Sequence, residues 1–349
     1  MAAVERAAHR WFGWSYAQRV FVAASLLSMI AASGSLFVGD LSIDAATVSD
    51  ALFRHDDRLA SHVIIRDWRL PRAVADLLVG AALGMAGAVM QATTRNPLAS
   101  PGIMGLTTGA SFVGLLVTIA SPAAGRLELM VASITGATLG AALVYGLASM
   151  SRTGLTPIRL ALTGVAVSSI IAAIGNGVTI YYNLGQDMLL WYARGSEGVQ
   201  WPDIFFAAPL ILPGLLGGVV LSSSINALGL GDHVATGLGL RTGTTRFFSS
   251  CVVLVLAGAA TALTGPIGFI GLLSPHLALA LVGLDYRAVI PNAAVIGATL
   301  MVLADVGARA ATTPYKAPVP VGVVTALLGV PFFLYLANRR STRSQGGRV

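Results

Sequence analysis

Two aspartates lie within long apolar stretches, and each has an arginine four residues away: Arg72 with Asp76, and Asp305 with Arg309. That spacing places both partners on one face of a helix. A charge at the centre of a bilayer costs roughly 2.5–3.5 kcal/mol on insertion scales, so such residues need an account. Both pairs fall near the expected outer ends of their helices. Each pair therefore either fixes the depth of its helix at the interface or holds an arginine outward to meet a partner protein.

The other reactive residue types offer little catalytic chemistry. The only lysine, Lys316, lies in a proline-rich loop, so a phosphate-cradling GxxxxGK[ST] loop cannot be present. The five histidines are scattered, and no Ser/His/Asp arrangement stands out. The single cysteine, Cys251, excludes an internal disulfide and a multi-cysteine metal site, and we expect it to be a small buried residue. We therefore expect no catalytic residue, no metal site and no cofactor in this chain.

Composition indicates a protein that lies almost entirely in a membrane. Of 349 residues, 55% are hydrophobic and only 11% are charged, and the mean hydropathy is +0.78. A bilayer core requires about 20 apolar residues per helix, and runs of that order recur throughout the chain. The expected fold class is all-α, a polytopic membrane protein forming a single transmembrane domain over residues 1–349. About ten spans are predicted: Val20–Val38, Pro71–Gln91, Ile103–Ala120, Leu127–Met150, Pro157–Ile180, Ile204–Ser222, Thr244–Thr264, Phe269–Gly283, Val289–Ala308 and Val319–Ala337.

The second expected span shows how these helices pack. Pro71 suits the first turn of a helix, because its missing N–H leaves no hydrogen bond unmade there. Gly80 and Gly84 form a GxxxG pattern, which allows membrane helices to approach closely. The polar break Arg95-Asn96-Pro97 then predicts an elbow before a shorter third span. The third and eighth spans are short and glycine-rich, and the polar segment Asp40–Asp67 is expected to hold a short surface helix.

The distribution of charge predicts the orientation in the membrane. Ten spans place both termini on one side. With the termini inside, the inner segments hold 13 of the 22 Lys and Arg residues and the outer segments hold the other nine. The positive-inside rule therefore favours cytoplasmic tails at 1–19 and 338–349. The net charge of +7 and the pI near 10.1 then reflect membrane orientation, and we expect no nucleic-acid partner.

Several motifs resemble one known family. The stretch from Arg69 to Ala110, RLPRAVADLLVGAALGMAGAVMQATTRNPLASPGIMGLTTGA, resembles the hallmark of the FecCD family, the permeases of bacterial importers for ferric siderophores, haem and vitamin B12. The resemblance continues in chain order over nearly the whole sequence, which makes it specific. The further matching stretches are WYARGSEGVQW (191–201), LGLGDHVATGLGL (228–240), GPIGFIGLLSPHLAL (265–279), DVGAR (305–309) and PVGVVTALLGVPFFLYL (320–336).

This resemblance implies a transport function. Helices two to five and seven to ten would form an inverted repeat, in agreement with the two short helices. The chain would pair with a second permease, identical or paralogous, with two cytoplasmic ATPase subunits that bind ATP and Mg, and with a periplasmic or lipid-anchored substrate-binding protein. It would move a ferric siderophore across the bacterial inner membrane by alternating access, with haem or vitamin B12 as the alternative cargo. A secondary transporter is disfavoured, because Asp76 and Asp305 lie near helix ends.

The resemblance also assigns roles to individual residues. Three arginines at the outer face would meet glutamates of the binding protein: Arg69, Arg72 and Arg309. A cytoplasmic coupling segment over residues 226–241 would dock on the ATPase through Leu228, Gly231, Asp232, His233, Ala235, Gly237, Leu238 and Gly239. An inner gate would join the elbow to the turn that precedes the fifth span, through Asn96, Leu98, Thr156, Pro157 and Ile158.

Four residues at the end of the fifth span are polar or aromatic enough to touch a passing chelate: Asn176, Thr179, Tyr181 and Tyr182. Helix packing and interfacial aromatic anchoring explain the same residue types, so both interpretations stay open. Three positions depart from the family pattern: Leu279 stands where arginine is usual, Pro318 stands where glutamate is usual, and Glu197 stands in a segment that is often small or neutral. The departures suit one half of a heterodimer, although the sequence also leaves a homodimer open.

Overall fold

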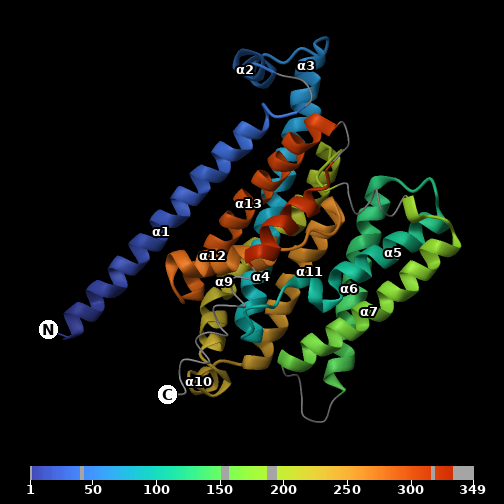
Figure 1. Ribbon diagram of the computed structural model, residues 1–349. Helices are drawn as coiled ribbons and strands as arrows, with labels where there is room; N and C mark the ends of the chain where they lie inside the picture. Colours follow the sequence, from blue (N-terminus) through green and yellow to red (C-terminus); the bar gives the residue numbers. More distant parts are fainter. Residues whose placement is uncertain (1, 40–42, 151–156, 187–194, 316–318, 333–349) are drawn as a thin grey trace.

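The computed structural model describes residues 2–39, 43–150, 157–186, 195–315 and 319–332, and all the regular secondary structure in these ranges is helical (Figure 1). The helices are α1 (Ala2–Ser35), α2 (Ala45–Phe53), α3 (Ala60–Val63), the π-helical η1 (Ile64–Arg69), α4 (Leu70–Thr94), the 3₁₀-helical η2 (Pro101–Met104), α5 (Leu106–Ala120), α6 (Arg126–Ser149), α7 (Pro157–Tyr181), α9 (Trp201–Gly229), α10 (Asp232–Gly237), α11 (Thr242–Thr264), α12 (Ile270–Val282) and α13 (Tyr286–Tyr315). A further helix spans Val321–Phe332.

The all-α polytopic membrane fold is confirmed. Within the described ranges, 7 helices are long and apolar enough to cross a membrane, and the remaining three predicted spans overlap the shorter apolar helices Leu106–Ala120, Ile270–Val282 and Val321–Phe332. The third and eighth spans are therefore short, as the sequence predicts. Because these helices fall below the length of about 20 residues that a full crossing needs, the count of ten crossings stays a prediction.

The predicted GxxxG contact forms between α4 and α13. A Cβ added to Gly80 would lie 2.3 Å from the carbonyl oxygen of Gly297, and one added to Gly84 would lie 2.2 Å from that of Ala293. Such distances leave room for hydrogen alone. The two helices therefore touch backbone to backbone, in the manner of small-residue crossings in membranes.

A second crossing of the same kind holds the short helix α5 against α6. A Cβ on Gly109 would lie 2.3 Å from the carbonyl oxygen of Gly136, and one on Gly140 would lie 2.3 Å from that of Gly105. Because α5 has only 15 residues, close packing on the longer α6 fixes a helix that could not span a bilayer alone. Figure 1 shows α5, α6 and α7 as one group beside the bundle that contains α4 and α13.

The outer part of α4 differs from the sequence prediction. We expected a helix to begin at Pro71, but helical structure runs without a break from Ala60 through α3 and η1 into α4. A proline removes an N–H and crowds the carbonyl four residues earlier. The wider π-helical turn Ile64–Arg69 lies directly before Pro71 and accommodates both defects. The predicted short surface helix is α2.

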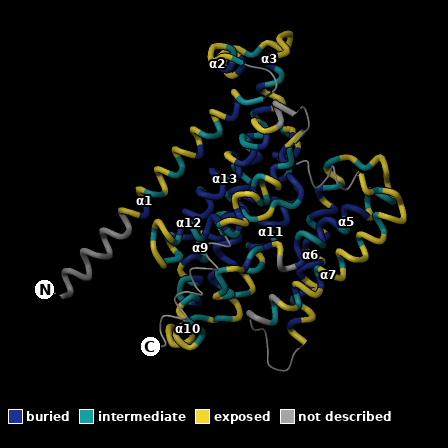
Figure 2. The backbone as a smooth tube through the Cα atoms, viewed as in Figure 1, coloured by how far each residue is buried: buried dark blue, intermediate teal, exposed yellow. Residues whose placement is uncertain are grey.

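Burial divides the helices into two classes (Figure 2). In the most apolar stretch of each span, 72% of the residues are buried in α13 but only 11% in α1 and in α7. Cys251 on α11 is exposed, so our expectation of a buried cysteine was wrong. Local apolar character predicts that α11 lies in the membrane, but it does not say which face of the helix meets other helices.

Candidate functional site

The two arginine–aspartate pairs meet in one buried cluster between α4 and α13. The carboxylate of Asp305 is fully buried, and it accepts hydrogen bonds from Nε and Nη2 of Arg72 at 3.0 and 2.6 Å. Nη2 of Arg309 lies 2.8 Å from its other oxygen. Hydrogen bonds between an arginine and a carboxylate are charge-assisted and roughly twice as strong as neutral ones. The sequence correctly predicts the pair within α13, but Arg72 binds across the helix crossing to Asp305 rather than to Asp76.

Asp76 is left in an unusual position. It is fully buried one turn from Arg72, and neither of its carboxylate oxygens has a hydrogen-bond partner among the described residues. The glycine crossing explains the exchange of partners, because it brings Asp305 close enough to take the guanidinium of Arg72. A buried acid without such a partner is costly. Asp305 is therefore the carboxylate that pairs with both arginines of the cluster.

Two of the predicted docking arginines, Arg69 and Arg309, hold the end of α1. Nη1 of Arg69, a residue only 8% exposed, donates to the carbonyl of Leu36 at 2.6 Å. Nη1 of Arg309 donates to the carbonyls of Ser35 and Val38 at 2.9 and 2.8 Å. Carbonyl groups at a helix C-terminus lack partners within the helix, and the last turn of α1 carries no basic residue of its own. This capping contact was missed by sequence reasoning, which assigned both arginines outward.

The predicted docking residues are thus partly engaged within the subunit. The side chains of Arg72 and Arg309 remain 18% and 12% exposed. Three other arginines at the same end of the bundle, which is the predicted outer end, are exposed around α2 and η1: Arg54, Arg58 and Arg66. Docking of a binding protein on Arg69, Arg72 and Arg309 stays a prediction.

The predicted elbow follows α4. Arg95 ends the helix in a left-handed conformation with φ of 50°, and the side-chain oxygen of Asn96 accepts a hydrogen bond from the N–H of Leu98 at 3.0 Å. Leu98 is 41% exposed. The second part of the predicted gate begins at Thr156, which lies outside the described residues. Pro157 and Ile158 form the first turn of α7, and their side chains also lie outside the described part of the chain.

The coupling segment is joined to this elbow by an ion pair. Asp232, at the start of α10, lies 3.1 Å from Nη2 of Arg95 and accepts hydrogen bonds from Nη2 of Arg246 on α11 at 2.8 and 2.9 Å. One carboxylate therefore links the end of α4, the short helix α10 and the start of α11. Sequence reasoning named Asp232 but missed both arginines, although each faces the same predicted side of the membrane.

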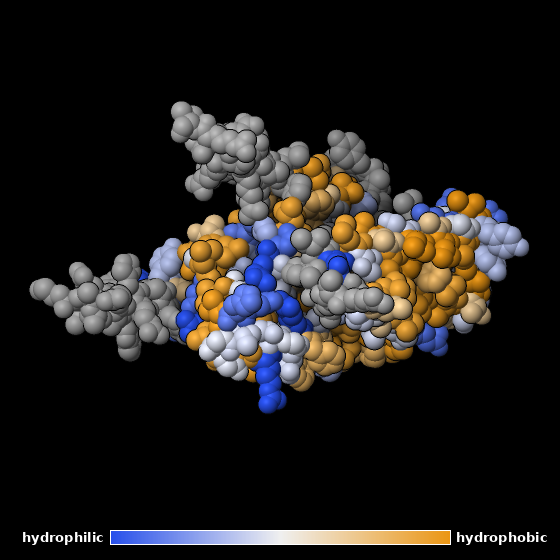
Figure 3. Space-filling view, turned by 90° about the horizontal axis from the view of Figure 1, so that it is seen from below, coloured by the Kyte–Doolittle hydropathy of each residue, from blue (hydrophilic) through white to orange (hydrophobic). Residues whose placement is uncertain are grey.

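The rest of the segment divides into anchors and an exposed apolar face. Leu228 and Ala235 are buried, with 1% and 0% exposure, whereas Leu238 is 68% exposed. Gly231 and Gly239 have φ of 114° and 80°, which only glycine adopts without strain, so they shape the turns on either side of α10. His233 and Gly237 are exposed. Figure 3, viewed from this end, shows hydrophilic residues in the centre and apolar residues on the flank.

The predicted path residues lie at the end of α7 that points away from the elbow. Asn176, Tyr181 and Tyr182 are exposed and Thr179 is half-buried. The rings of the two tyrosines meet edge to face, 5.1 Å apart. Their exposure fits either a path or an interfacial anchor, so the assignment stays a prediction. Of the three departures from the family pattern, Leu279 is half-buried on α12, Glu197 is exposed and Pro318 lies outside the described residues.

Comparison with known proteins connects these features. The chain matches the FecCD transport family over residues 26–339. It is similar to the iron(3+)-hydroxamate import system permease FhuB of Bacillus subtilis, with 41% identity over 95% of this chain and 86% of the relative. It is also similar to the hemin transport system permease HmuU of Yersinia pestis, with 36% identity over 92% of this chain and 96% of the relative.

A solved structure extends the likeness to three dimensions. It is an inward-facing conformation of a metal-chelate type ABC transporter, and it superposes with a TM-score of 0.79 at 28% identity, covering 92% of this chain and 99% of that chain. The resemblance inferred from the motifs therefore holds for the whole sequence and for the fold. The chain is a membrane permease that belongs to the FecCD transport family.

Proposed function

We propose that this chain is the permease subunit of an ATP-binding-cassette importer that moves a ferric siderophore across the bacterial inner membrane by alternating access. The observation that carries the proposal is the match to iron-chelate permeases over nearly the entire chain. Haem import is the second candidate, because a relative named for hemin transport is 36% identical over 92% of this chain. Vitamin B12 import is the third candidate, because a relative named for cobalamin import is 36% identical over 81% of this chain.

ATP hydrolysis is assigned to two partner ATPase chains, which would bind ATP and Mg, and no cofactor is assigned to this chain. The coupling segment supports the assignment. Leu230, Val234 and Leu238 are 64%, 48% and 68% exposed around α10, and an exposed apolar patch with a polar rim is typical of a protein-binding surface. The ion pairs of Asp232 would carry a movement of α10 to the elbow before α5. A second permease, identical or paralogous, would complete the path.

The proposed orientation places α10 in the cytoplasm and α2 outside, at opposite ends of the bundle (Figure 1). Both termini would then be cytoplasmic. Arg69, Arg72 and Arg309 would meet acidic side chains of the binding protein at the outer end. Their contacts with Asp305 and with the end of α1 support this role by holding the guanidinium groups in place, since a fixed arginine loses less freedom when it binds a carboxylate.

Transport by the reconstituted complex tests the proposal. The permease would be placed in proteoliposomes with its ATPase and binding protein, and uptake of a ferric hydroxamate, haem and cobalamin would be compared with and without ATP. We expect ATP-dependent uptake of the ferric hydroxamate only. Uptake of haem or cobalamin instead would select the alternative cargo. Uptake that needs an ion gradient but not ATP would overturn the assignment as a whole.

Salt dependence tests the docking arginines. Binding-protein affinity should weaken as salt rises, because steering charges are screened beyond about 8–10 Å at physiological ionic strength. Arg69→Glu with Arg72→Glu should abolish docking, and glutamate-to-arginine changes on the binding protein should partly restore it. Because both residues also make internal contacts, the restoration separates docking from misfolding. Wild-type affinity in the double variant would refute the role.

A further inference from the structure

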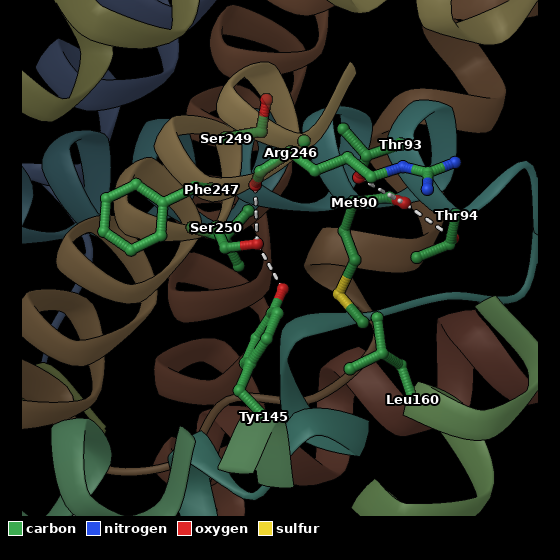
Figure 4. A pocket seen from close by; sticks show the side chains of 11 residues that line it. Met90, Thr93, Thr94, Tyr145, Leu160, Arg246, Phe247, Ser249 and Ser250 are labelled. Atoms are coloured by element: carbon green, nitrogen blue, oxygen red, sulfur yellow. Dashed lines mark hydrogen bonds between the residues drawn. The ribbon is translucent and has the colours of Figure 1, made fainter. Parts of the chain in front are cut away.

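A cavity of about 300 Å³ lies at the α10 end of the bundle, beside the ion pair of Arg246 with Asp232 (Figure 4). Its walls come from the last turns of α4, from α6, from the start of α7 and from the first turns of α11. The lining residues are Met90, Thr93, Thr94, Tyr145, Leu160, Gly243, Arg246, Phe247, Ser249, Ser250 and Val253. The volume is at the lower end of the range of about 300–1,000 Å³ for ligand pockets.

The lining has two chemical parts. Met90, Leu160, Phe247 and Val253 supply an apolar wall, whereas Arg246 is the one charged group among the lining residues. In Figure 4 the guanidinium of Arg246 extends toward Thr94, at one side of the apolar wall. A ligand that matches both parts has an apolar body and an anionic head.

The hydroxyl groups around the cavity offer no free donor to a ligand. The hydroxyl of Ser249, a residue only 1% exposed, has no hydrogen-bond partner among the described residues. The neighbouring hydroxyls are used, because Tyr145 and Ser250 bond to each other and both threonines donate to carbonyls of α4. The Ser249 oxygen is not accessible from the cavity, and in Figure 4 it points away from Tyr145, Met90 and Leu160, so a bound molecule must be held by other groups.

The guanidinium of Arg246, in contrast, retains donors. The hydrogen bonds that the structure gives this group all run from Nη2 to Asp232, and a guanidinium offers five N–H donors. Arg95 lies on the far side of the same carboxylate, 3.1 Å from it, and adds positive charge nearby. The local charge therefore favours an anion.

We propose that this cavity binds an anionic phospholipid of the cytoplasmic leaflet, with its acidic head on Arg246 and an acyl chain along Leu160 and Val253. Basic pockets between membrane helices on the cytoplasmic side are suited to acidic head groups. The depth of the site agrees, because Arg246 is in the second turn of α11, level with the end of α4. The side of the membrane rests on the proposed orientation, but the lipid chemistry does not.

Native mass spectrometry of the purified, delipidated full-length chain tests the proposal. Dioctanoyl-phosphatidylglycerol, dioctanoyl-phosphatidylcholine and inorganic phosphate would be added separately. We expect one phosphatidylglycerol per chain, bound at least about tenfold more tightly than phosphatidylcholine, and no retained phosphate, since a hydrogen bond to a charged group changes affinity by about tenfold or more. Equal binding of the two lipids would overturn the anionic head, and phosphate binding as tight as that of the lipid would overturn the role of the acyl chain.

Four variants locate the site. Arg246→Gln should lower phosphatidylglycerol affinity at least about tenfold, to the level of phosphatidylcholine. Asp232→Asn should raise it, because the competing carboxylate is gone. Val253→Trp and Leu160→Trp should abolish binding of both lipids by filling the cavity from opposite walls.

Arg287→Gln is the matched control, an inner arginine outside the cavity that pairs with Asp285, and it should bind as the wild type does. Thermal unfolding identifies filling variants that fail to fold, and the two substitutions at the ion pair then decide the question. Wild-type affinity in both Arg246→Gln and Asp232→Asn would refute the site. The lipid measurement uses neither the ATPase nor the binding protein, so a failure of lipid binding and a failure of ATP-dependent transport are observed separately.

Discussion

Helices α4 and α7 have the same length, 25 residues, and both are apolar, yet they occupy opposite environments. In the most apolar stretch of each span, 78% of residues are buried around α4 and 11% in α7. The difference lies in where small residues meet other helices. Gly80, Gly84 and Gly87 of α4 all face the backbone of a neighbour, whereas a Cβ added to Gly177 of α7 would meet nothing within 4 Å.

An apolar helix of this length can therefore be either enclosed by other helices or left at the surface of the subunit. In α4 the absence of a side chain is required by contact with α12 and α13. In α7, large apolar side chains such as Leu162 and Ile170 point outward, 66% and 60% exposed. That face is left for lipid or for another chain.

Substituting the glycines should produce the largest difference. Gly84→Leu places a side chain where the carbonyl oxygen of Ala293 lies 2.2 Å from the added Cβ. Because backbone cannot move aside as a side chain can, the cost should exceed the usual 1–3 kcal/mol of overpacking. We expect loss of monodisperse protein in detergent, measured by size-exclusion chromatography. Gly177→Leu on α7 should behave as the wild type does, and equal loss in both would end the contrast.

Removing the shared carboxylate should have the next largest effect. Asp305→Asn leaves two largely buried arginines without their common partner, and breaking a buried ion pair costs about 3–5 kcal/mol. The unfolding midpoint of the purified permease should fall sharply. Asp76→Asn should cost much less, because no described group donates a hydrogen bond to Asp76. Equal shifts in the two variants would show that both acids carry the cluster.

Coupling at α10 should respond without a change in stability. Leu238→Asp alters a side chain that is 68% exposed, so folding should be retained while an apolar contact with the ATPase is lost. We expect binding-protein-stimulated ATP hydrolysis to fall about tenfold or more, as for loss of a central interface contact. Gly237→Pro should act in the same direction. Asp285→Asn at the same end is the control, and retained stimulation in both coupling variants would exclude α10 as the coupling element.

The smallest expected effect is at the link between α10 and the elbow. The side chains of Arg95 and Asp232 are 41% and 42% exposed, and exposed pairs contribute about 0–1 kcal/mol. Arg95→Ala should therefore leave the unfolding midpoint nearly unchanged but weaken stimulated ATP hydrolysis. The charge exchange Arg95→Asp with Asp232→Arg should restore part of it. A double-mutant cycle with no coupling term would show that the link transmits nothing.

The sequence by itself determined the features that depend on residues close together in the chain. Hydropathy fixed the apolar spans and the short third and eighth helices, and the spacing of Gly80 and Gly84 predicted a close helix crossing. The polar residues after α4 predicted the elbow. The family motifs are also short contiguous stretches of sequence, so membership of the FecCD family could be predicted from them. Each of these properties depends on the residues of one segment and on whether they favour water or lipid, so no tertiary information was required.

Only the tertiary structure decided which side chains meet. Arg72 and Asp305 are 233 positions apart, and Arg95 and Asp232 are 137 apart. At such separations the pairing follows from how the helices cross, and the sequence offered the nearer but incorrect partner Asp76 for Arg72. The outward face of α7 and the capping of α1 were also undetermined, because apolar residues suit lipid and protein equally well. The backbone contact at the α4–α13 crossing selected one arrangement, and the charges then paired across it.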